Sequence, residues 1–426
     1  MSKLKNNPWY WIPTLYFTQG LPYVAVMSIS IVMYKKIGMS NTDIALYTGW
    51  LGLPWVIKPF WSPFVDIIKT KRWWTLTMQW VIAIALACIA FSIPTEFYVQ
   101  FTFAIFMLMG FASATHDIAA DGYYMLALSE HDQSLYVGIR STFYRIATVA
   151  GQGALVFLAG YIETKWGNIP LAWTIVFIVL SLFFLIIATY HSFILKKPDK
   201  DVTHTEVNSK MIFREFFNSF KTFFTKLPPK QTAAAIGFML LYRFPEAQLT
   251  KIIQPFLLDP TDKGGLGLST AQVGIVYGTI GIIGLTLGGI IGGIAAAKGG
   301  LKKWLQPMAW GMSLTCLTFV YLSYAQDPSL LIVNICIFIE QFGYGFGFTA
   351  YLLYMIYYSE GQFKTSHYAI CTGFMALSMM LGMVAGWIQE QIGYQHFFIY
   401  TMICCVTTIG MAALVKVDEN FGKKRE

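Results

Sequence analysis

The sequence predicts an all-α, polytopic membrane protein, and three observations support this fold class. Only 12% of the 426 residues are charged and 56% are hydrophobic, whereas a soluble domain carries about 25% charged residues because its surface faces water. Apolar runs of about 20 residues recur along the whole chain, and this is the length that a helix needs to cross a bilayer. Lys and Arg gather in short segments between these runs, as membrane topology requires.

Counting the apolar runs predicts about twelve transmembrane helices in two sets of six. We expect the first six at 9–34, 42–65, 73–94, 98–128, 136–161 and 169–194. We expect the second six at 231–257, 270–297, 304–325, 329–358, 367–391 and 395–416. The predicted domains are a six-helix bundle at 1–195, a cytoplasmic linker at 196–230 and a second six-helix bundle at 231–426. The first run is full length and has no signal-peptide cleavage pattern, so we expect it to remain as a helix.

The basic residues predict the orientation of the chain. With the N-terminus in the cytoplasm, about 21 Lys and Arg fall in cytoplasmic segments and about 4 in external loops. We therefore expect an inner-membrane protein with both termini in the cytoplasm. The net charge of +8 then reflects topology, and we expect no binding of nucleic acid.

The linker combines apolar and basic residues in a helical pattern. Its apolar stripe consists of Met211, Ile212, Phe216, Phe220, Phe223, Phe224 and Leu227. Basic residues flank this stripe, which favours an amphipathic helix on the anionic inner leaflet. A flexible linker explains the same composition, and the sequence does not separate the two.

The two halves of the chain repeat each other. Segment 158–167 parallels 384–393, and segment 124–130 parallels 354–360, with an offset of about 226–230 residues. A parallel six-plus-six repeat is how major facilitator carriers are built, with the solute site between the halves near the midplane of the bilayer. The repeat therefore predicts the major facilitator fold.

The turn after the second predicted span reads Lys58-Pro-Phe-Trp-Ser-Pro-Phe-Val-Asp66 and is followed by a basic turn with Lys71 and Arg72. This pattern resembles the gating motif of the major facilitator superfamily, in which a carboxylate pairs with a neighbouring helix and latches one conformation. The candidate gating residues are therefore Asp66, Lys71 and Arg72. The equivalent turn at 292–303 keeps its lysines but has no acid. Control of topology alone also explains these charges.

Ionisable residues inside the predicted spans are the strongest indication of function, since a charge at the bilayer centre costs several kcal/mol unless it is paired or hydrated. Arg243 and Glu246 are three residues apart and share a helix face, as do Asp117 and Asp121, which are four apart. Two roles fit these charges. A carboxylate in such surroundings can pick up a proton for coupled transport, whereas a buried Arg–Glu pair can also simply fasten helices.

The candidate residues form two sets. The proton-coupling candidates are Glu246, Glu340, Asp117 and Asp121. The substrate-binding candidates are Arg145, Arg243, Lys58, Gln19, Tyr16, Tyr23, Gln341 and Tyr344. Arginines suit an anionic or polyhydroxyl solute, and flat aromatic rings suit a sugar, although packing or lipid contact explains any single ring.

The sequence contains no nucleophile–base constellation, no HExxH and no phosphate loop, so we expect neither enzymatic activity nor a cofactor. The glycine run at 342–348 lies inside an apolar span with no strand before it, and it favours close helix contact or bending of the helix. The six cysteines lie in apolar runs without metal-ligand spacing. We expect them to be buried, small apolar residues without a disulfide or a metal role.

Several segments, in order from the first span to the eleventh, resemble one family. They are Lys58-Pro-Phe-Trp-Ser-Pro-Phe-Val-Asp66, His116-Asp-Ile-Ala-Ala-Asp121, Tyr144-Arg145, Leu241-Tyr-Arg-Phe-Pro-Glu246, Glu340-Gln-Phe-Gly-Tyr-Gly345 and Val384-Ala-Gly-Trp387. On these residues the chain resembles the AmpG-type muropeptide permeases and their relatives, the acetyl-coenzyme A transporters. The resemblance implies the major facilitator fold and proton-driven import of anhydro-muropeptide-type saccharides.

Two departures from the family pattern bear on function. The family usually has Gln before the first Asp of the fourth-span motif, where this chain has His116, and this adds a titratable group. Longer bacterial members carry two further spans for which this chain has no room. A smaller amino sugar or another saccharide therefore fits as well as a muropeptide.

The leading hypothesis is a monomeric, proton-coupled transporter that takes up a saccharide by alternating access of its two halves. Its partners are then a small-molecule solute, protons and the lipid bilayer. Two alternatives remain open at this stage. One is a carrier of acetyl-coenzyme A or another organic anion, which needs a strongly basic cavity, and the other is a non-transporting membrane sensor that signals through the linker.

Overall fold

The computed structural model describes residues 7–37, 39, 50–201, 209–268, 272, 275–325 and 328–423. Within these ranges the chain is helical and has no strand, which confirms the predicted all-α class. Eight helical stretches in the described residues are long and apolar enough to cross a membrane. The second, seventh, ninth and eleventh predicted spans are helices with a break or with part of their length outside the described residues.

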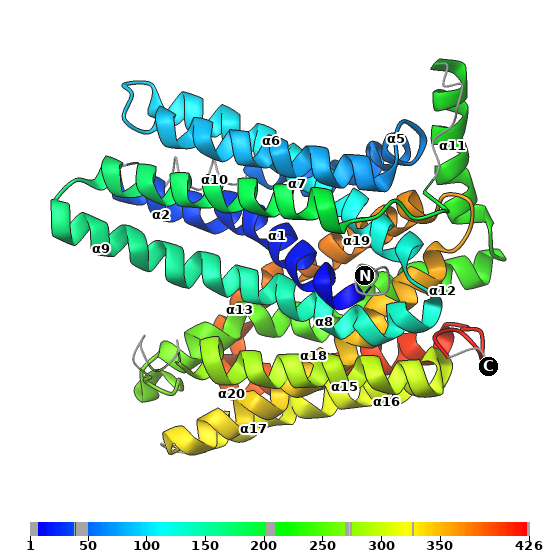
Figure 1. The fold of residues 1–426 in the computed structure, drawn as a ribbon. Coiled ribbons are helices and arrows are strands. Elements are labelled where there is room, and N and C mark those ends of the chain that lie inside the picture. The colour runs from blue at the N-terminus through cyan, green and yellow to red at the C-terminus, as the bar shows by residue number, and fades with distance from the viewer. Residues whose placement is uncertain are drawn as a thin grey trace. The chain divides into compact units, whose positions relative to one another are not determined.

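The first half of the chain begins with α1 (Ile12–Val24), which continues through a π-helical segment (Ala25–Ile29) into α2 (Ser30–Lys36). The next helices are α4 (Leu53–Ile57), α5 (Ser62–Ile67), α6 (Lys71–Ser92) and α7 (Tyr98–Ala127). They are followed by α8 (Glu130–Val149), α9 (Val156–Trp166), α10 (Ile169–Ile194) and the linker helix α11 (Ser209–Thr225). Figure 1 shows α6, α7 and α10 running along one another.

The second half contains α12 (Pro229–Leu241), α13 (Phe244–Leu258), α15 (Ile282–Gly299), α16 (Leu301–Thr315) and α17 (Leu317–Tyr324). It ends with α18 (Leu330–Ser359), α19 (Lys364–Met380) and α20 (Ala385–Leu414). Helix α20 is interrupted at Gly393, which has φ 75° and ψ 169°. Because a positive φ favours glycine, this residue marks the change from the eleventh to the twelfth predicted span.

Local sequence signals explain several helix boundaries. Asn168 accepts a hydrogen bond from the backbone N–H of Leu171 over 2.9 Å and caps α10, whose bounds equal the predicted 169–194. Thr70 caps α6 in the same way through Trp73. The prediction of 136–161 for the fifth span was too short. Helix α8 begins at Glu130, because acidic residues in its first turn suit the positive helix end.

The chain forms two compact units that do not follow the repeat boundaries strictly. The first unit comprises Met1–Ala127, Phe143–Ser219 and Phe363–Ala369. The second unit comprises Leu128–Thr142, Phe220–Gln362 and Ile370–Glu426. Helices α8, α11 and α19 therefore each contribute to both units. The predicted division at 1–195, 196–230 and 231–426 stays a prediction.

The first unit has a core in which α6 and α10 pack against each other and α7 packs against α6. Its largest buried side chains include Trp173, Phe106 and Phe177, and the rings of Phe106 and Phe177 meet edge to face at 5.7 Å. Ser181 donates to the carbonyl of Ala83 over 2.8 Å. Ring packing and an interhelical hydrogen bond are the forces that hold helices together where lipid replaces water.

The second unit is held by close helix approach. Helix α18 packs along α15 and α16, and a Cβ at Gly345 would collide with the backbone of Leu285 on α15. A Cβ at Gly347 would collide with the side chain of Met312 and with the backbone of Met308 on α16. The predicted role of the glycine run in close helix contact is therefore confirmed.

The prediction that the cysteines are buried was right for five residues and wrong for one. Cys316, Cys336, Cys371, Cys404 and Cys405 are buried, and none of the six is in a disulfide. Cys88 is exposed on α6, because the apolar outer face of a membrane helix is as hydrophobic as its inner face. Hydrophobicity along the sequence cannot separate these two faces.

Candidate functional site

The first charged cluster lies in the first unit around Asp117 and Asp121, which are both buried on α7. Four residues separate them, so they share one face of an unbroken helix. The Nζ atom of Lys58 lies 3.8 Å from Oδ2 of Asp117. The hydroxyl of Tyr16 on α1 donates to Oδ1 of Asp121 over 3.1 Å. Each carboxylate thus has a polar partner from a different span.

A helix break positions Lys58. Residues Lys58–Phe60 form a 3₁₀ turn between α4 and α5, and Pro59 removes a backbone donor and disturbs the preceding helical turn. On α1, Gln19 is buried and Tyr23 is partly buried. The ring of Tyr23 meets that of Trp55 edge to face at 5.1 Å. The structure therefore brings predicted residues of the first, second and fourth spans close together.

His116, which precedes Asp117, belongs to a buried hydrogen-bonded chain that sequence reasoning missed. Its Nε2 atom lies 3.0 Å from the amide nitrogen of Gln79. The amide oxygen of Gln79 lies 3.0 Å from Nδ1 of His191, whose Nε2 is 2.9 Å from the hydroxyl of Thr14. Gln79 and His191 are polar residues inside apolar runs, and that is the signal that could have found them.

The second charged cluster lies in the second unit around Arg243. Its Nε donates to Oε2 of Glu246 over 2.8 Å, and its Nη2 donates to Oε1 over 3.0 Å. Nη2 also donates to the hydroxyl of Tyr344 over 3.0 Å. The guanidinium lies 4.7 Å from the ring centroid of Phe348. This is a buried, bidentate ion pair with an aromatic wall on one side.

The pair forms where the seventh span is broken. Arg243 stands between α12 and α13 with φ −97° and ψ 9°, and Pro245 follows at the start of α13. Proline has no backbone N–H, and its ring clashes with the carbonyl four residues earlier, which here is that of Leu241 at the end of α12, so one continuous helix cannot run through this point. Arg243 is the N-cap of α13 and Glu246 lies in its first turn, so the predicted spacing of three residues brings them together, here at the start of a helix.

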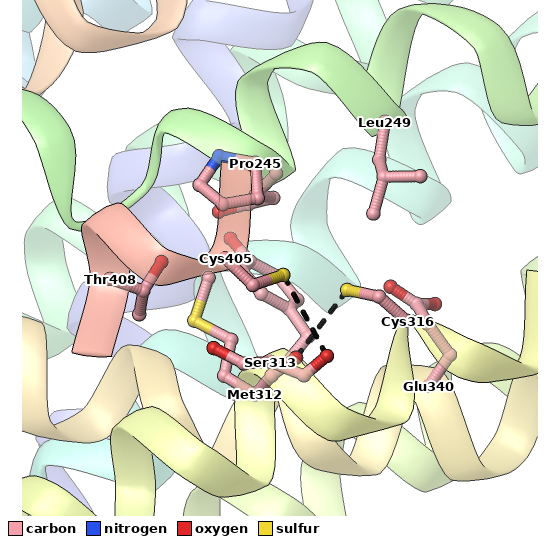
Figure 2. A pocket seen from close by; sticks show the side chains of 10 residues that line it. Pro245, Leu249, Met312, Ser313, Cys316, Glu340, Cys405 and Thr408 are labelled. Carbon is pink, nitrogen blue, oxygen red and sulfur yellow. Dashed lines mark hydrogen bonds between the residues drawn. The ribbon is translucent and has the colours of Figure 1, made fainter. Parts of the chain in front are cut away.

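Glu340 lies in a pocket of the second unit next to this pair (Figure 2). Its Oε2 accepts a hydrogen bond from the amide of Gln341 over 2.8 Å, and that amide also donates to the hydroxyl of Tyr277 over 3.3 Å. The free volume is about 10 Å³, room for about one water molecule. The pocket is lined by Pro245, Glu246, Leu249, Met312, Ser313, Cys316, Glu340, Tyr344, Cys405 and Thr408.

Arg145 differs from the other predicted arginine. It is partly buried on α8, in the part of that helix that belongs to the first unit. Arg243, in contrast, is buried and bound by two side chains in the second unit. The role of Arg145 in substrate binding stays a prediction.

The predicted gating residues meet in the first unit. The Nζ atom of Lys71 lies 2.8 Å from Oδ1 of Asp66. Oδ2 of Asp66 accepts a hydrogen bond from the backbone N–H of Ser366 over 2.8 Å and another from its hydroxyl. Ser366 lies in the first turn of α19, so the carboxylate also faces the positive end of a helix.

Arg72 and a residue that sequence reasoning missed complete this region. The guanidinium of Arg72 donates to the carbonyls of Leu195 over 2.5 Å and Ser192 over 2.9 Å, at the end of α10. The carboxylate of Asp201 accepts from the backbone N–H groups of Lys71 over 2.7 Å and Arg72 over 3.1 Å. Asp201 thereby caps α6 from the linker. No spacing in the sequence links a residue of the linker to the third span.

Comparison with known proteins defines the class. Residues 14–362 match the Major Facilitator Superfamily, and the chain belongs to this superfamily of membrane transporters. The solved outward-facing structure of the transporter FucP aligns with a TM-score of 0.69 at 11% identity, covering 96% of this chain and 98% of that one. The predicted fold is thereby confirmed.

Within the superfamily the chain is similar to AmpG-type transporters. It is 27% identical over 405 residues to putative transporter AmpG 4 of Rickettsia conorii, covering 92% of each chain. It is 22% identical over 398 residues to the anhydromuropeptide permease of Escherichia coli K12, covering 92% of this chain and 76% of that protein. The chain is a multi-pass membrane transporter and not an enzyme.

Proposed function

We propose that this transporter is a proton-coupled importer of a saccharide, such as an anhydro-muropeptide or an amino sugar. It works as a monomer in the inner membrane, by alternating access, with both termini in the cytoplasm. The observation that carries the proposal is the buried cluster of Arg243, Glu246 and Tyr344 beside Glu340.

The geometry of this cluster favours solute binding over a purely structural role. A buried ion pair is weak evidence for stability, because desolvation offsets most of its attraction. Discontinuous helices at mid-span commonly form transport sites, and Arg243 stands at such a break. The pocket has room for about one water molecule, so binding of a sugar requires this region to widen.

The same cluster offers a route for proton coupling. A proton on Glu246 would remove the charge that both hydrogen bonds from Arg243 need. Arg243 would then be available to hydroxyl or carboxylate groups of the solute. Glu340, held by a neutral amide, is a second acceptor in the same pocket. Asp117 and Asp121 form a corresponding pair in the first unit.

The chemistry of the solute follows from the charges and the relatives. A carrier for acetyl-coenzyme A needs a strongly basic cavity for phosphates, whereas Arg243 pairs with Glu246 and Lys58 with Asp117. The near-neutral balance of these clusters favours a sugar with few charges. The name of the relative from Escherichia coli, anhydromuropeptide permease, supports the same class.

The experiment measures uptake into proteoliposomes under an imposed pH gradient, with labelled anhydro-muropeptide and labelled N-acetylglucosamine as separate probes. We expect uptake by the native protein and its loss in Glu340→Gln or Glu246→Gln. Glutamine cannot take up a proton as a carboxylate does, so each variant removes one of the two acceptors that the proposed coupling uses. The conservative control is Asp262→Asn in the described external loop, which should transport normally.

Three outcomes separate the possibilities. Unchanged uptake in both glutamine variants would remove these residues from the coupling role. Solute binding without flux would identify a sensor. Uptake of acetyl-coenzyme A, and of neither sugar, would identify an anion carrier.

A further inference from the structure

The linker helix α11 presents a row of exposed phenyl rings that no transport step uses. Phe213, Phe217 and Phe224 are 62%, 66% and 45% exposed. At about 100° per residue, these three positions fall within about 40° of one another around the helix. A contiguous exposed apolar surface of this kind marks an interaction site.

A different face of α11 seats the helix on the protein. In the first unit, the ring of Phe216 stacks on Phe64 of α5 at 5.6 Å. In the second unit, Phe223 is fully buried and meets Tyr358 of α18 at 5.1 Å. These two positions lie about 90° around the helix from the exposed row. The exposed rings are therefore additional to the surface that α11 needs for packing.

Basic side chains border the exposed row on its other side. Arg214 and Lys221 are exposed and lie about 70° around the helix from the phenyl rings. The sequence of α11 contains one acid, Glu215. An apolar row with basic residues along its edge suits the boundary between acyl chains and anionic headgroups.

The direction of α11 also agrees with binding to the surface of a bilayer. Figure 1 shows α11 running crosswise to α6 and α10, and residues up to Ser219 belong to the first unit with these two helices. A helix that runs crosswise to membrane-spanning helices lies along the bilayer surface. A bilayer is also the one partner that surrounds a multi-pass transporter at all times.

We propose that α11 binds the anionic leaflet of the membrane, with Phe213, Phe217 and Phe224 at the acyl boundary and with Arg214 and Lys221 on acidic phospholipid headgroups. The linker is then held at the bilayer. This inference is independent of the solute, and its test needs no transport assay.

The position of the phenyl row is tested by lipid quenching in the full chain. Phe217→Trp, reconstituted in nanodiscs, adds one indole to the native tryptophans, and the added emission is the difference from the native protein. We expect lipids brominated on the acyl chain to quench it. Phe91→Trp, at a 71% exposed position of the membrane-spanning helix α6, is the positive control. Thr222→Trp places the indole on the opposite side of α11, and brominated lipids should not quench its added emission.

Two results would overturn the lipid contact. Added emission from position 217 that resists bromine but responds to aqueous iodide would place the row in water. Emission protected from both quenchers would show that protein, such as a second copy of the chain, covers the row.

The headgroup preference is tested by counting retained lipids with native mass spectrometry. We expect the native protein to retain phosphatidylglycerol over phosphatidylcholine, and Arg214→Gln with Lys221→Gln to weaken this preference about tenfold or more. The matched control neutralises two exposed lysines elsewhere, Lys303 and Lys416, and should keep the preference. An unchanged preference in the α11 variant would overturn the headgroup assignment.

Discussion

The two basic turns, one in each unit, are stabilised in different ways. In the first unit, Asp66 and Lys71 belong to the same turn and pair at 2.8 Å, with side chains only 13% and 5% exposed. In the second unit, the turn at 292–303 has no acid, and Lys302 pairs with Glu419 of the C-terminal segment. These side chains are 53% and 73% exposed. The first turn thus uses a buried charge pair and the second an exposed one.

In the second unit, where the charge pair is exposed and weak, packing contacts stabilise the turn. The backbone N–H of Leu301 donates to the carbonyl of Phe421 over 3.0 Å, and the buried ring of Phe421 meets Tyr357 of α18 edge to face at 5.1 Å. Exposed ion pairs contribute little, because water screens them. A turn without its acid is therefore still held in place, here by a segment about 120 residues later in the chain.

The largest expected effect comes from Asp66→Asn. This change leaves the buried ammonium of Lys71 without its carboxylate, and loss of one partner of a buried pair costs about 3–5 kcal/mol. We expect a clearly lower melting temperature in detergent by tryptophan fluorescence. Asp262→Asn, an exposed acid, is the control and should melt like the native protein. A native melting temperature for Asp66→Asn would contradict the buried-pair account.

A smaller effect is expected from Phe421→Ala. Removal of this buried ring costs about 2 kcal/mol, less than the broken ion pair. Proteolysis of the C-terminal segment, followed by mass spectrometry, should also become faster as the segment detaches. Phe157→Ala, at a 75% exposed position, provides the comparison for loss of a ring without loss of packing. Equal proteolysis in both variants would show that Phe421 does not hold the segment.

The smallest effect is expected from Glu419→Gln, with no measurable change in melting temperature. Lys302 lowers the pKa of Glu419, so any contribution of the pair is present above the ordinary carboxylate pKa and disappears as the pH falls through the lowered one. Added salt should remove it as well. A fall in melting temperature as large as that of Asp66→Asn would contradict the proposed difference between a buried, stabilising pair in the first turn and a weak, exposed pair in the second.

Much of the fold could be predicted, because membrane helices are defined by local composition. Segment 169–194 was predicted to the residue, since Asn168 caps it and the run is uniformly apolar. The break at Arg243 was missed, although Pro245 gave a signal. The first residues of the second and eighth predicted spans, 42–65 and 270–297, lie outside the described residues.

The candidate site was predictable in its residue types and less so in its pairings. A buried charge inside an apolar run is visible in the sequence, as for Glu340 and Asp117. Contacts made across the chain are not, as for Asp201 with α6 or Glu419 with Lys302. Such pairs depend on tertiary packing, and no local spacing encodes them.

The central claim is that buried carboxylates of the second unit move protons together with the solute. The most direct test follows the pH of a weakly buffered proteoliposome suspension after addition of anhydro-muropeptide or N-acetylglucosamine. The account predicts alkalinisation of the medium with the native protein and none with Glu246→Gln or Glu340→Gln. Solute entry without any pH change in the native protein, or equal alkalinisation in both variants, would contradict it.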